Sequence, residues 1–401
     1  MQKRLLILGG SRFIIPVIQA AHELGHYVIT MDYLPDNIAH SFSDEYVNVS
    51  IVDKEAVCAA AEKLQVDGIT SFAADPGVIS AAYTAEQLGL PFQGSYRSVE
   101  ILQKKDLFRA FLAEHGFNCP QFFMFRSAEE ALEHANDFPY PVIVKPTDSA
   151  GSKGCTRVDC ASELAAAVEY ALPFSQDGSC IIEQFLEKLY PSFSADCFSI
   201  NGKIVCLPFT TQLFDKNAAN PYTPAGSQMP SSIPEKHLEQ LRGELQRLFD
   251  LLELRTGVYN VETRVATDGL PYIMEVSPRG GGNRLCELLR YASGVDLIRA
   301  SVQAALGEDV QDVHDPVIDG YWHESILHSA HGGIFAGMWY APGFKEAHVI
   351  NEQLWVEPGD VVEGFSAANQ AFGTIVFRFD TKEELATFNA AEDQFMHAII
   401  D

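Results

Sequence analysis

The chain has 401 residues, of which 47% are hydrophobic and 20% charged, and it carries a net charge of −26. A chain of this length and composition is globular and has room for two or three domains. Its acidity excludes nonspecific binding of nucleic acid as a function, because neutralising phosphates requires a basic surface.

The eight cysteines are scattered through the chain and form no Cys-x-x-Cys pair. This usage is typical of thiols in a reducing compartment. The first ten residues, MQKRLLILGG, contain an apolar run that is too short for a signal peptide. No apolar stretch reaches the roughly 18 residues that mark a membrane span. We therefore expect a cytoplasmic protein without a membrane partner.

The N-terminal segment alternates strands and helices. Residues 4–8 predict a buried strand, 9–11 a tight glycine turn and 13–24 a helix, and two more strand–helix units follow up to about residue 98. Such alternation predicts an open, parallel α/β sheet. An NAD site would need the fingerprint G-x-G-x-x-G, which the turn lacks. A Rossmann-like scaffold is therefore the favoured interpretation, and a dinucleotide-dependent oxidoreductase is the least supported one.

Two lysines stand out in the next segment. A helix over 99–115 carries Lys105, and an apolar strand ends at Lys145, whose stem can be buried while its ammonium points into a site. The small, flexible loop 149–154 follows, and its backbone N–H groups are able to hold phosphate. An edge-strand lysine and an ordinary hairpin loop remain the alternatives for Lys145 and this loop.

Residues 212–232 are rich in Pro, Gly and Asn and predict an irregular lid or binding loop. The tail beyond about residue 308 predicts short strands and turns, closed by a helix from Lys382. Three histidines in this tail are close in sequence, but their spacing fits no helical face. We therefore expect no metal site at His323, His328 and His331.

A β-hairpin is predicted around the dipeptide Asp268-Gly269, because a two-residue turn needs positive φ and favours this pair. If these are the two central turn residues, Thr267 pairs with Leu270. The same register, continued along both strands, sets the pairing of the residues further from the turn.

In that register Glu262 faces Glu275, with the Cβ atoms roughly 4.5–5.5 Å apart. Two carboxylates at that distance require a shared proton or a cation. Mg²⁺ fits best, because it binds carboxylates together with substrate phosphates. Arg279 leaves the second strand on the same face as Glu275 and Ser277, and three glycines follow it. Two unrelated glutamates on an exposed sheet face remain the alternative.

Taken in order, these pieces resemble the ATP-grasp superfamily over nearly the whole chain. The resemblance is greatest to the carbamoyl-phosphate-synthase-like group, which includes amino-acid ligases. The motifs that carry it are Lys105 in QKKDLFR, Lys145 in VIVKP, the loop 149–154, IIEQFL, PSFSADCFSINGK, and VETR together with IMEVSPRGGG.

The resemblance implies a fold of mixed class, α/β and α+β. A Rossmann-like preATP-grasp open sheet is expected over 1–98 and a two-lobed ATP-grasp domain over 99–307. The small lobe would span about 120–185 and the large lobe about 186–307. A small β-rich C-terminal domain, ending in a helix, is expected over 308–401.

The resemblance also implies ATP as the nucleotide and a role for each motif residue. Lys105 and Lys145 would contact the phosphates. Glu187 would bind the ribose hydroxyls, since Ser192 stands where the family often has an acidic residue. The other nucleotide-binding residues would be Ser149, Gly151, Ser152 and Gly154 of the closing loop, and Glu183, Gln184 and Leu186 at the adenine edge.

At the other end of the nucleotide, the resemblance implies that Glu262 and Glu275 ligate Mg²⁺, with Mn²⁺ as a substitute. Ser277 is the third implied ligand, although the family often has asparagine there, which affects a second metal ion. Arg279 would bind the acyl phosphate or the substrate carboxylate, and Arg279 and Lys145 are the implied catalytic residues.

The implied activity is that of an ATP-dependent carboxylate–amine ligase. A carboxylate would attack the γ-phosphate, and an amine would then displace phosphate from the acyl phosphate to form an amide. Its partners would be small-molecule substrates, amino acids among them, and the family suggests a homodimer. A bicarbonate-activating, carboxylase-like enzyme and a non-catalytic nucleotide-binding protein are the alternatives.

Overall fold

The computed structural model describes residues 1–149 and 151–401 and confirms the expected mixed α/β class, with one parallel sheet and several antiparallel ones. The chain divides into two compact units. Unit 1 consists of Met1–Cys119, Ser194–Pro208 and Pro234–Pro316. Unit 2 consists of Pro120–Phe193, Phe209–Ile233 and Val317–Asp401. The three-domain division expected from the sequence stays a prediction.

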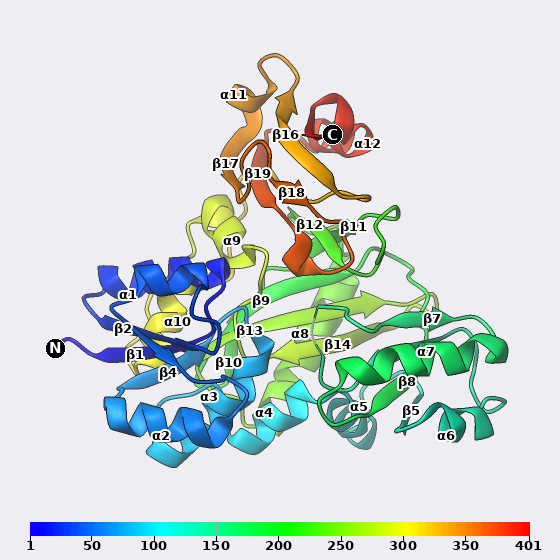
Figure 1. Ribbon diagram of the computed structural model, residues 1–401, viewed down its shortest axis with the longest axis horizontal. Coiled ribbons are helices and arrows are strands. Elements are labelled where there is room, and N and C mark those ends of the chain that lie inside the picture. The colour runs from blue at the N-terminus through cyan, green and yellow to red at the C-terminus, as the bar shows by residue number, and fades with distance from the viewer. Residues whose placement is uncertain (150) are drawn as a thin grey trace. The chain divides into compact units, whose positions relative to one another are not determined.

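Unit 1 contains the parallel sheet, in the strand order β3-β2-β1-β4. Helices cover both of its faces (Figure 1). The side chains of Leu5 to Leu8 are fully buried, as a strand covered on both sides requires. The elements are β1 (Arg4–Leu8), η1 (Arg12–Ile14), α1 (Ile15–Glu23), β2 (Tyr27–Asp32), η2 (Ile38–Phe42), β3 (Glu45–Asn48), α2 (Lys54–Leu64), β4 (Gly68–Ser71) and α3 (Asp75–Leu88).

The predicted helix over 99–115 is wrong as a single element. Two helices occupy this segment, α4 (Tyr96–Gln103) and α5 (Lys105–Glu114), because Lys104 takes an extended conformation with φ −99° and ψ 116°. This break places Gln103 at the end of one helix and Lys105 at the start of the next. The sequence contains no glycine or proline there that would have indicated the break.

The rest of unit 1 surrounds a second sheet, in which β14-β13-β9 are neighbours and β10 pairs with β9. The turn between β9 and β10 is Asn201-Gly202, and both residues have positive φ, 51° and 81°. The elements are β9 (Phe193–Ile200), β10 (Lys203–Cys206), α8 (Glu235–Leu251), β13 (Gly257–Val265), β14 (Pro271–Ser277), α9 (Leu285–Ser293) and α10 (Leu297–Ala305).

The predicted turn between β13 and β14 is wrong by one residue. The N–H of Ala266 donates to the carbonyl of Leu270 at 3.1 Å, so three residues form the loop, and Gly269 ends it with φ 79°. Thr267 therefore does not pair with Leu270. A β-bulge after Glu262 then shifts the register back by one residue, and Glu262 faces Glu275 as predicted.

In unit 2, the antiparallel order β5-β8-β6-β7 forms one sheet, and its apolar face packs against two helices. Val142, Val144 and Ile182 are buried in this core. The elements are β5 (Phe122–Phe125), α6 (Ala128–Glu133), β6 (Val142–Pro146), β7 (Thr156–Val158), η3 (Ala161–Glu163), α7 (Leu164–Ala171), η4 (Leu172–Phe174) and β8 (Cys180–Gln184).

Unit 2 also contains the neighbouring strands β11-β12-β15-β19-β17. The prediction that 212–232 is irregular is wrong in part, because this segment includes the end of β11 (Thr210–Phe214) and all of β12 (Pro224–Met229). A Cβ on Gly226 would lie 2.3 Å from the carbonyl oxygen of Glu324, so the glycine that resembled a loop signal permits close strand pairing. The remaining strands are β15 (Tyr321–Leu327), β17 (Val349–Leu354) and β19 (Gly373–Phe379).

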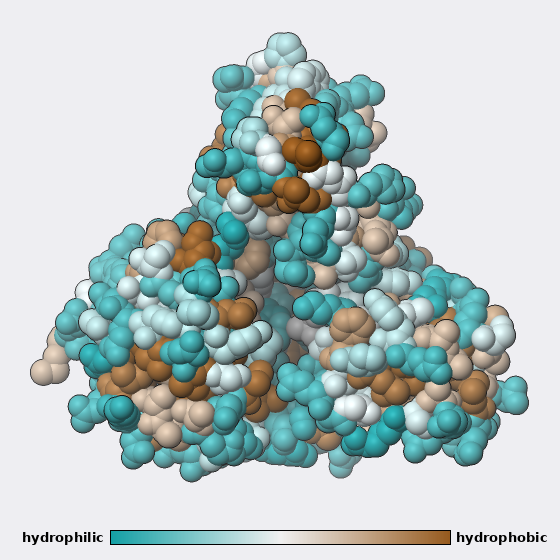
Figure 2. Space-filling view, in the orientation of Figure 1, coloured by the Kyte–Doolittle hydropathy of each residue, from teal (hydrophilic) through white to brown (hydrophobic). Residues whose placement is uncertain are grey.

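The end of the chain adds the order β18-β16-β20, packed on a core rich in phenylalanine. The expected final helix is followed by strand β20, which pairs with β16, so the chain does not end in a helix. Figure 2 shows apolar atoms gathered over the region that Figure 1 labels β16 and β18. The elements are β16 (Gly333–Tyr340), α11 (Phe344–His348), β18 (Val361–Val362), η5 (Ala368–Gln370), α12 (Lys382–Ala390), η6 (Glu392–Gln394) and β20 (Met396–Ile400).

Across residues 1–149 and 151–401, no helix is both long and apolar enough to cross a membrane. All eight cysteines are free thiols.

Candidate active site

In unit 2, Lys145 and Glu183 form a buried ion pair. They lie on the neighbouring strands β6 and β8, and the Nζ of Lys145 is 2.5 Å from the Oε2 of Glu183. The side chain of Glu183 is 1% exposed and that of Lys145 is 13% exposed. Breaking a buried ion pair from one side costs about 3–5 kcal/mol, because the remaining charge is left uncompensated. Lys145, which the sequence predicts to contact phosphate, is thus held in place by a carboxylate of the same sheet.

The predicted phosphate loop follows β6 directly. Gly151, Ser152 and Gly154 all have positive φ, from 58° to 70°, whereas Ala150 lies outside the described residues. The Oγ of Ser152 donates to the carbonyl of Tyr222 at 3.1 Å. Backbone N–H groups in a turn can face a shared concavity, which suits an anion.

The segment predicted to meet adenine continues from β8. The N–H of Gln184 donates to the carbonyl of Gln121 at 2.8 Å, and Leu186 is buried. Glu187 is half exposed and forms an ion pair of 2.8 Å with Arg157, whose guanidinium stacks 4.4 Å from the ring centre of Phe185. Glu187, the predicted ribose ligand, is therefore paired with Arg157 in this structure.

In unit 1, the paired strands β13 and β14 place Glu262 directly opposite Glu275. Both side chains are half-buried. Opposed carboxylates repel each other, and a divalent cation with oxygen ligands relieves that repulsion. The residues present therefore fit Mg²⁺, since two carboxylates from neighbouring strands offer it anionic oxygens.

Arg279 follows β14 and forms an ion pair with Asp75. Its Nε lies 2.8 Å from Oδ1 and its Nη2 2.7 Å from Oδ2 of that carboxylate, which is a two-point fork. Burial by itself would lower the pKa of Arg279, but the charges of Asp75 and Glu275 more than offset it and raise that pKa. The guanidinium therefore carries a fixed positive charge close to Glu275.

Ser277, the third predicted metal ligand, is buried and hydrogen-bonded on both sides. Its Oγ donates to Oδ1 of Asp75 at 3.0 Å and accepts from Nε2 of Gln103 at 2.7 Å. Lys105, the other predicted phosphate ligand, is the first residue of α5 and is half-buried. Helix α4 lies against β14, and this packing brings Gln103 to the strand.

Asp196 bonds to the glycine loop that follows Arg279. Its Oδ1 accepts from the Nδ2 of Asn260 at 3.0 Å and from the N–H of Gly281 at 2.8 Å, and its Oδ2 lies 2.9 Å from the thiol of Cys286. Burial raises the pKa of Asp196, while these three donors oppose the shift. Burial also raises the pKa of the Cys286 thiol well above its usual range.

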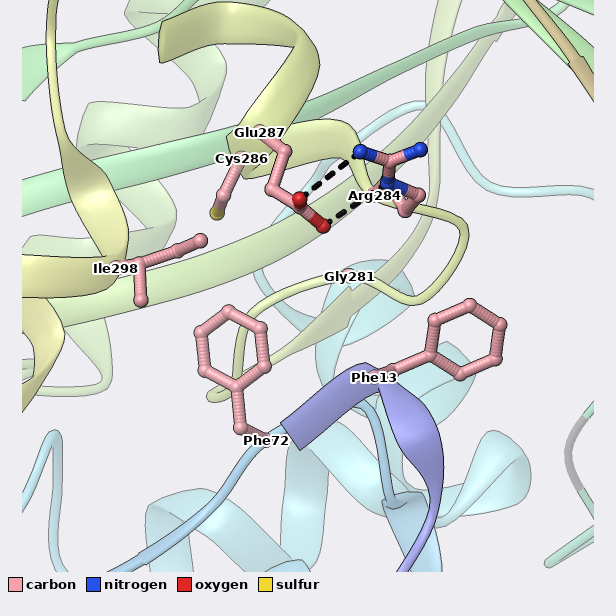
Figure 3. A pocket seen from close by; sticks show the side chains of 7 residues that line it. All are labelled: Phe13, Phe72, Gly281, Arg284, Cys286, Glu287 and Ile298. Atoms are coloured by element: carbon pink, nitrogen blue, oxygen red, sulfur yellow. Dashed lines mark hydrogen bonds and ion pairs between the residues drawn. The ribbon is translucent and has the colours of Figure 1, made fainter. Parts of the chain in front are cut away.

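A pocket opens beside this loop, also within unit 1. Figure 3 shows the rings of Phe13 and Phe72 on one side and a buried ion pair between Arg284 and Glu287 on the other. The Nε and Nη2 of Arg284 lie 3.1 and 3.0 Å from the two oxygens of Glu287. The pocket thus combines aromatic walls with a neutral pair of charges. Its lining is Phe13, Phe72, Gly281, Arg284, Cys286, Glu287 and Ile298.

Two histidines of the tail, His323 and His328, lie within hydrogen-bond distance of side chains. His323 lies 2.9 Å from Gln228 and 2.8 Å from Ser325, and burial lowers its pKa to about 3. His328 lies 3.2 Å from Asp215. Among residues 1–149 and 151–401, no three His, Cys, Asp or Glu side chains come together as a metal cluster.

Sequence reasoning missed several residues that complete these arrangements. Asp75 is one of them, and it holds Arg279 from a position 204 residues earlier. No local pattern distinguishes Gln103, Arg157, Asp196 or Asn260 from other polar residues. A carboxylate at the start of the helix that follows a parallel strand is the signal that could have found Asp75.

A family model described as an ATP-grasp domain matches residues 102–283. Among curated proteins, the carbamoyl phosphate synthase large chain of Thermotoga sp. (strain RQ2) is 24% identical over 298 residues. These cover 74% of this chain and 27% of that protein, so the chain spans about a quarter of the length of this relative.

Solved structures share the fold over the whole chain. An L-amino acid ligase from Bacillus licheniformis superimposes with a TM-score of 0.81 at 22% identity, covering 100% of this chain and 99% of that one. A phosphoribosylglycinamide synthetase from Anaerococcus prevotii gives a TM-score of 0.77 at 20% identity, with 100% of both chains covered. The matched segment 102–283 contains both lysines, both opposed glutamates and Arg279, so these residues lie in the part of the chain that matches the ATP-grasp domain.

Proposed function

We propose that the protein is an ATP-dependent carboxylate–amine ligase. A carboxylate oxygen of the first substrate attacks the γ-phosphorus of ATP, the bond to ADP breaks, and an acyl phosphate forms. The amine nitrogen of the second substrate then attacks the acyl carbon. Phosphate leaves, the amide forms, and the nitrogen releases a proton to solvent or base.

Unit 2 supplies the nucleotide-binding residues of this proposal. Lys145 moves from Glu183 to a phosphate oxygen, and the N–H groups of the loop at Ser149, Gly151, Ser152 and Gly154 cover the phosphates. Glu183 and the carbonyl of Gln184 meet the adenine amine, because the N–H of Gln184 is already donated to Gln121. Leu186 contributes its backbone. Glu187 reaches the ribose after it parts from Arg157.

Unit 1 supplies the residues for the reacting end. Glu262 and Glu275 hold Mg²⁺, which supplies charge neutralisation at the phosphates when bound, and Mn²⁺ is the proposed substitute. Arg279 binds the carboxylate or acyl phosphate, and Lys105 contacts a phosphate. ATP and the attacking carboxylate are both anionic, so fixed cations offset the repulsion between them and stabilise the charge that develops in the transition state.

The pocket of unit 1 is our candidate binding site for part of a small-molecule substrate. Its aromatic walls at Phe13 and Phe72 favour an apolar group, and the neutral pair of Arg284 and Glu287 favours a group without net charge. The assembly proposed with this function is a homodimer, which sedimentation equilibrium of the purified chain tests directly.

The observation that carries the proposal is the opposition of Glu262 and Glu275 beside Arg279, within the segment that matches the ATP-grasp domain. The test is phosphate release from MgATP across a panel of amino acids and small acids, added singly and in pairs. Release that needs both an acid and an amine supports the ligase. Release with bicarbonate alone would instead support the carboxylase-like enzyme, and binding of ATP without release would favour a nucleotide-binding protein.

Within that assay, the Glu275→Gln variant should lose at least about 100-fold in turnover, because removing one pre-positioned group at developing charge has this effect. Its matched control is Glu239→Gln on the exposed face of α8, which should turn over at the wild-type rate. Equal turnover of both variants would remove Glu275 from the site.

A further inference from the structure

Arg279 is fixed by three hydrogen bonds to two groups, the carboxylate of Asp75 and the carbonyl of Gly280. Two of its nitrogens grip the oxygens of Asp75 at 2.7 and 2.8 Å, and its Nη1 donates to the carbonyl of Gly280 at 3.1 Å. The side chain of Arg279 is 9% exposed. A guanidinium fork on a carboxylate fixes orientation as well as position. Small movements of Asp75 would therefore move the charge of Arg279.

Asp75 is itself placed by its backbone. It is the first residue of helix α3, where the helix dipole favours a negative charge. The preceding residue pair is anchored too, because the N–H of Ala73 donates to the carbonyl of Gly280 at 3.1 Å. The same glycine carbonyl thus receives a bond from Arg279 and a bond from the turn that presents Asp75.

Ser277 completes this arrangement from β14. Its only hydroxyl proton is donated to the oxygen of Asp75 that also accepts from the Nε of Arg279, and Gln103 donates to its oxygen. A hydroxyl has one proton and two lone pairs. The serine proton and one lone pair therefore serve Asp75 and Gln103.

The charges of these side chains lead to the same conclusion, that Asp75 serves Arg279 and that the two glutamates serve the metal ion. Asp75 balances Arg279, so two negative charges remain on Glu262 and Glu275, equal and opposite to a divalent cation. A neutral hydroxyl adds no charge to that balance. Glu275 belongs to both groups, since its charge, together with that of Asp75, raises the pKa of Arg279.

We infer that Asp75 and Ser277 are positioning residues for Arg279, and that the metal ion is held by Glu262 and Glu275 without Ser277. The effect that we expect on the kinetics rests on the proposed function. The effect that we expect on metal binding can be measured without any enzymatic activity.

The first experiment measures Mn²⁺ binding by electron paramagnetic resonance, with a non-hydrolysable ATP analogue present. Ser277→Ala should bind Mn²⁺ within twofold of the wild-type affinity, whereas Glu275→Gln should weaken binding at least tenfold. Ser293→Ala on α9 is the matched control, since its hydroxyl bonds only within its own helix segment. A tenfold loss for Ser277→Ala would overturn the inference.

The second experiment measures steady-state kinetics for Asp75→Asn, which removes the charge but keeps the shape. We expect kcat/KM for the carboxylate substrate to fall about 100-fold, with KM for ATP unchanged, and Asp75→Glu to restore part of the loss. Thermal unfolding of each variant shows whether it is folded. An equal rise in KM for ATP, or no rescue by Asp75→Glu in a folded variant, would overturn the positioning role.

The two failures are distinguishable. If the wild type releases no phosphate with any pair of substrates, the proposed function fails, while the Mn²⁺ titration still decides whether Ser277 is a ligand. If the wild type is active and Ser277→Ala loses metal, the function stands and the inference fails.

Discussion

Two buried ion pairs, one in each unit, differ in how they are built. In unit 2, Lys145 meets Glu183 through one close contact of 2.5 Å between neighbouring strands. In unit 1, Arg279 meets Asp75 through two contacts from residues 204 positions apart in the chain, and Ser277 and Gly280 bond to the same pair.

The difference indicates which charge is able to change partners. A lysine ammonium is a point charge on a flexible stem, so Lys145 can turn from Glu183 to a phosphate with the exchange of one contact. An arginine fork loses several bonds at once when it moves. Under the proposed function, the pair in unit 2 is therefore suited to exchange when the nucleotide binds, whereas the pair in unit 1 is organised before the substrate arrives.

The largest effect is expected from Lys145→Met, which leaves the buried carboxylate of Glu183 without its ammonium. The free energy of unfolding should fall by about 3–5 kcal/mol. The double variant Lys145→Met/Glu183→Leu should recover most of this loss, because it removes both charges. Urea unfolding measures both values, and neither variant should bind ATP with the wild-type affinity.

The corresponding double variant in unit 1, Arg279→Met/Asp75→Leu, should not recover. It leaves the hydroxyl proton of Ser277 without its acceptor, and it removes one of the two hydrogen bonds to the carbonyl of Gly280. If the double variants in the two units recover the free energy of unfolding equally, the two ion pairs do not differ in the way described.

A smaller effect is expected from Gly280→Ala. A Cβ at this position would lie 2.2 Å from the ring of Phe72, so the loop that carries Arg279 must shift. Overpacking of this kind costs about 1–3 kcal/mol. Gly282→Ala is the matched control, since no atom lies within 4 Å of its added Cβ. Thermal unfolding of both variants gives the comparison, and equal stability would mean that the loop is not rigid.

The smallest effect concerns Asp196, a buried carboxylate of unit 1 that neutral donors hold. Burial raises its pKa in the folded state, so its contribution to stability is present below the unfolded pKa near about 3.9 and is lost as pH rises through the folded pKa. The free energy of unfolding of the wild type, relative to Asp196→Asn, should therefore fall as pH rises. Urea unfolding from pH 4 upwards, roughly the start of that range, measures this difference, and a constant difference would contradict it.

The prediction for Glu262 and Glu275 shows both the reach and the weakness of sequence reasoning. The hairpin signal at Asp268-Gly269 was strong, and the opposition of the glutamates is confirmed. The path to it contained two errors that cancelled, since the turn has three residues and a β-bulge restores the register. Bulges depend on packing across the pair, which the local pattern does not reveal.

Composition was less informative for the segment 212–232. Its glycine, proline and asparagine content resembled a loop, yet Gly226 lies in β12 because the neighbouring strand approaches within 2.3 Å of the position its Cβ would take. A glycine that serves close pairing and a glycine that serves a turn look the same in sequence. Only the neighbouring backbone separates the two uses.

The sequence by itself determined the alternating strands and helices of the N-terminal segment, the order of the ATP-grasp motifs and the hairpin that carries Glu262 and Glu275. Each of these follows from residues close together in the chain, where backbone periodicity and turn chemistry act. The tertiary structure alone decided that Asp75 holds Arg279 and that Ser277 bonds to Asp75. Those contacts join residues about 200 positions apart, and their partners are chosen by the packing of helix α3 and strand β14, which no local pattern specifies.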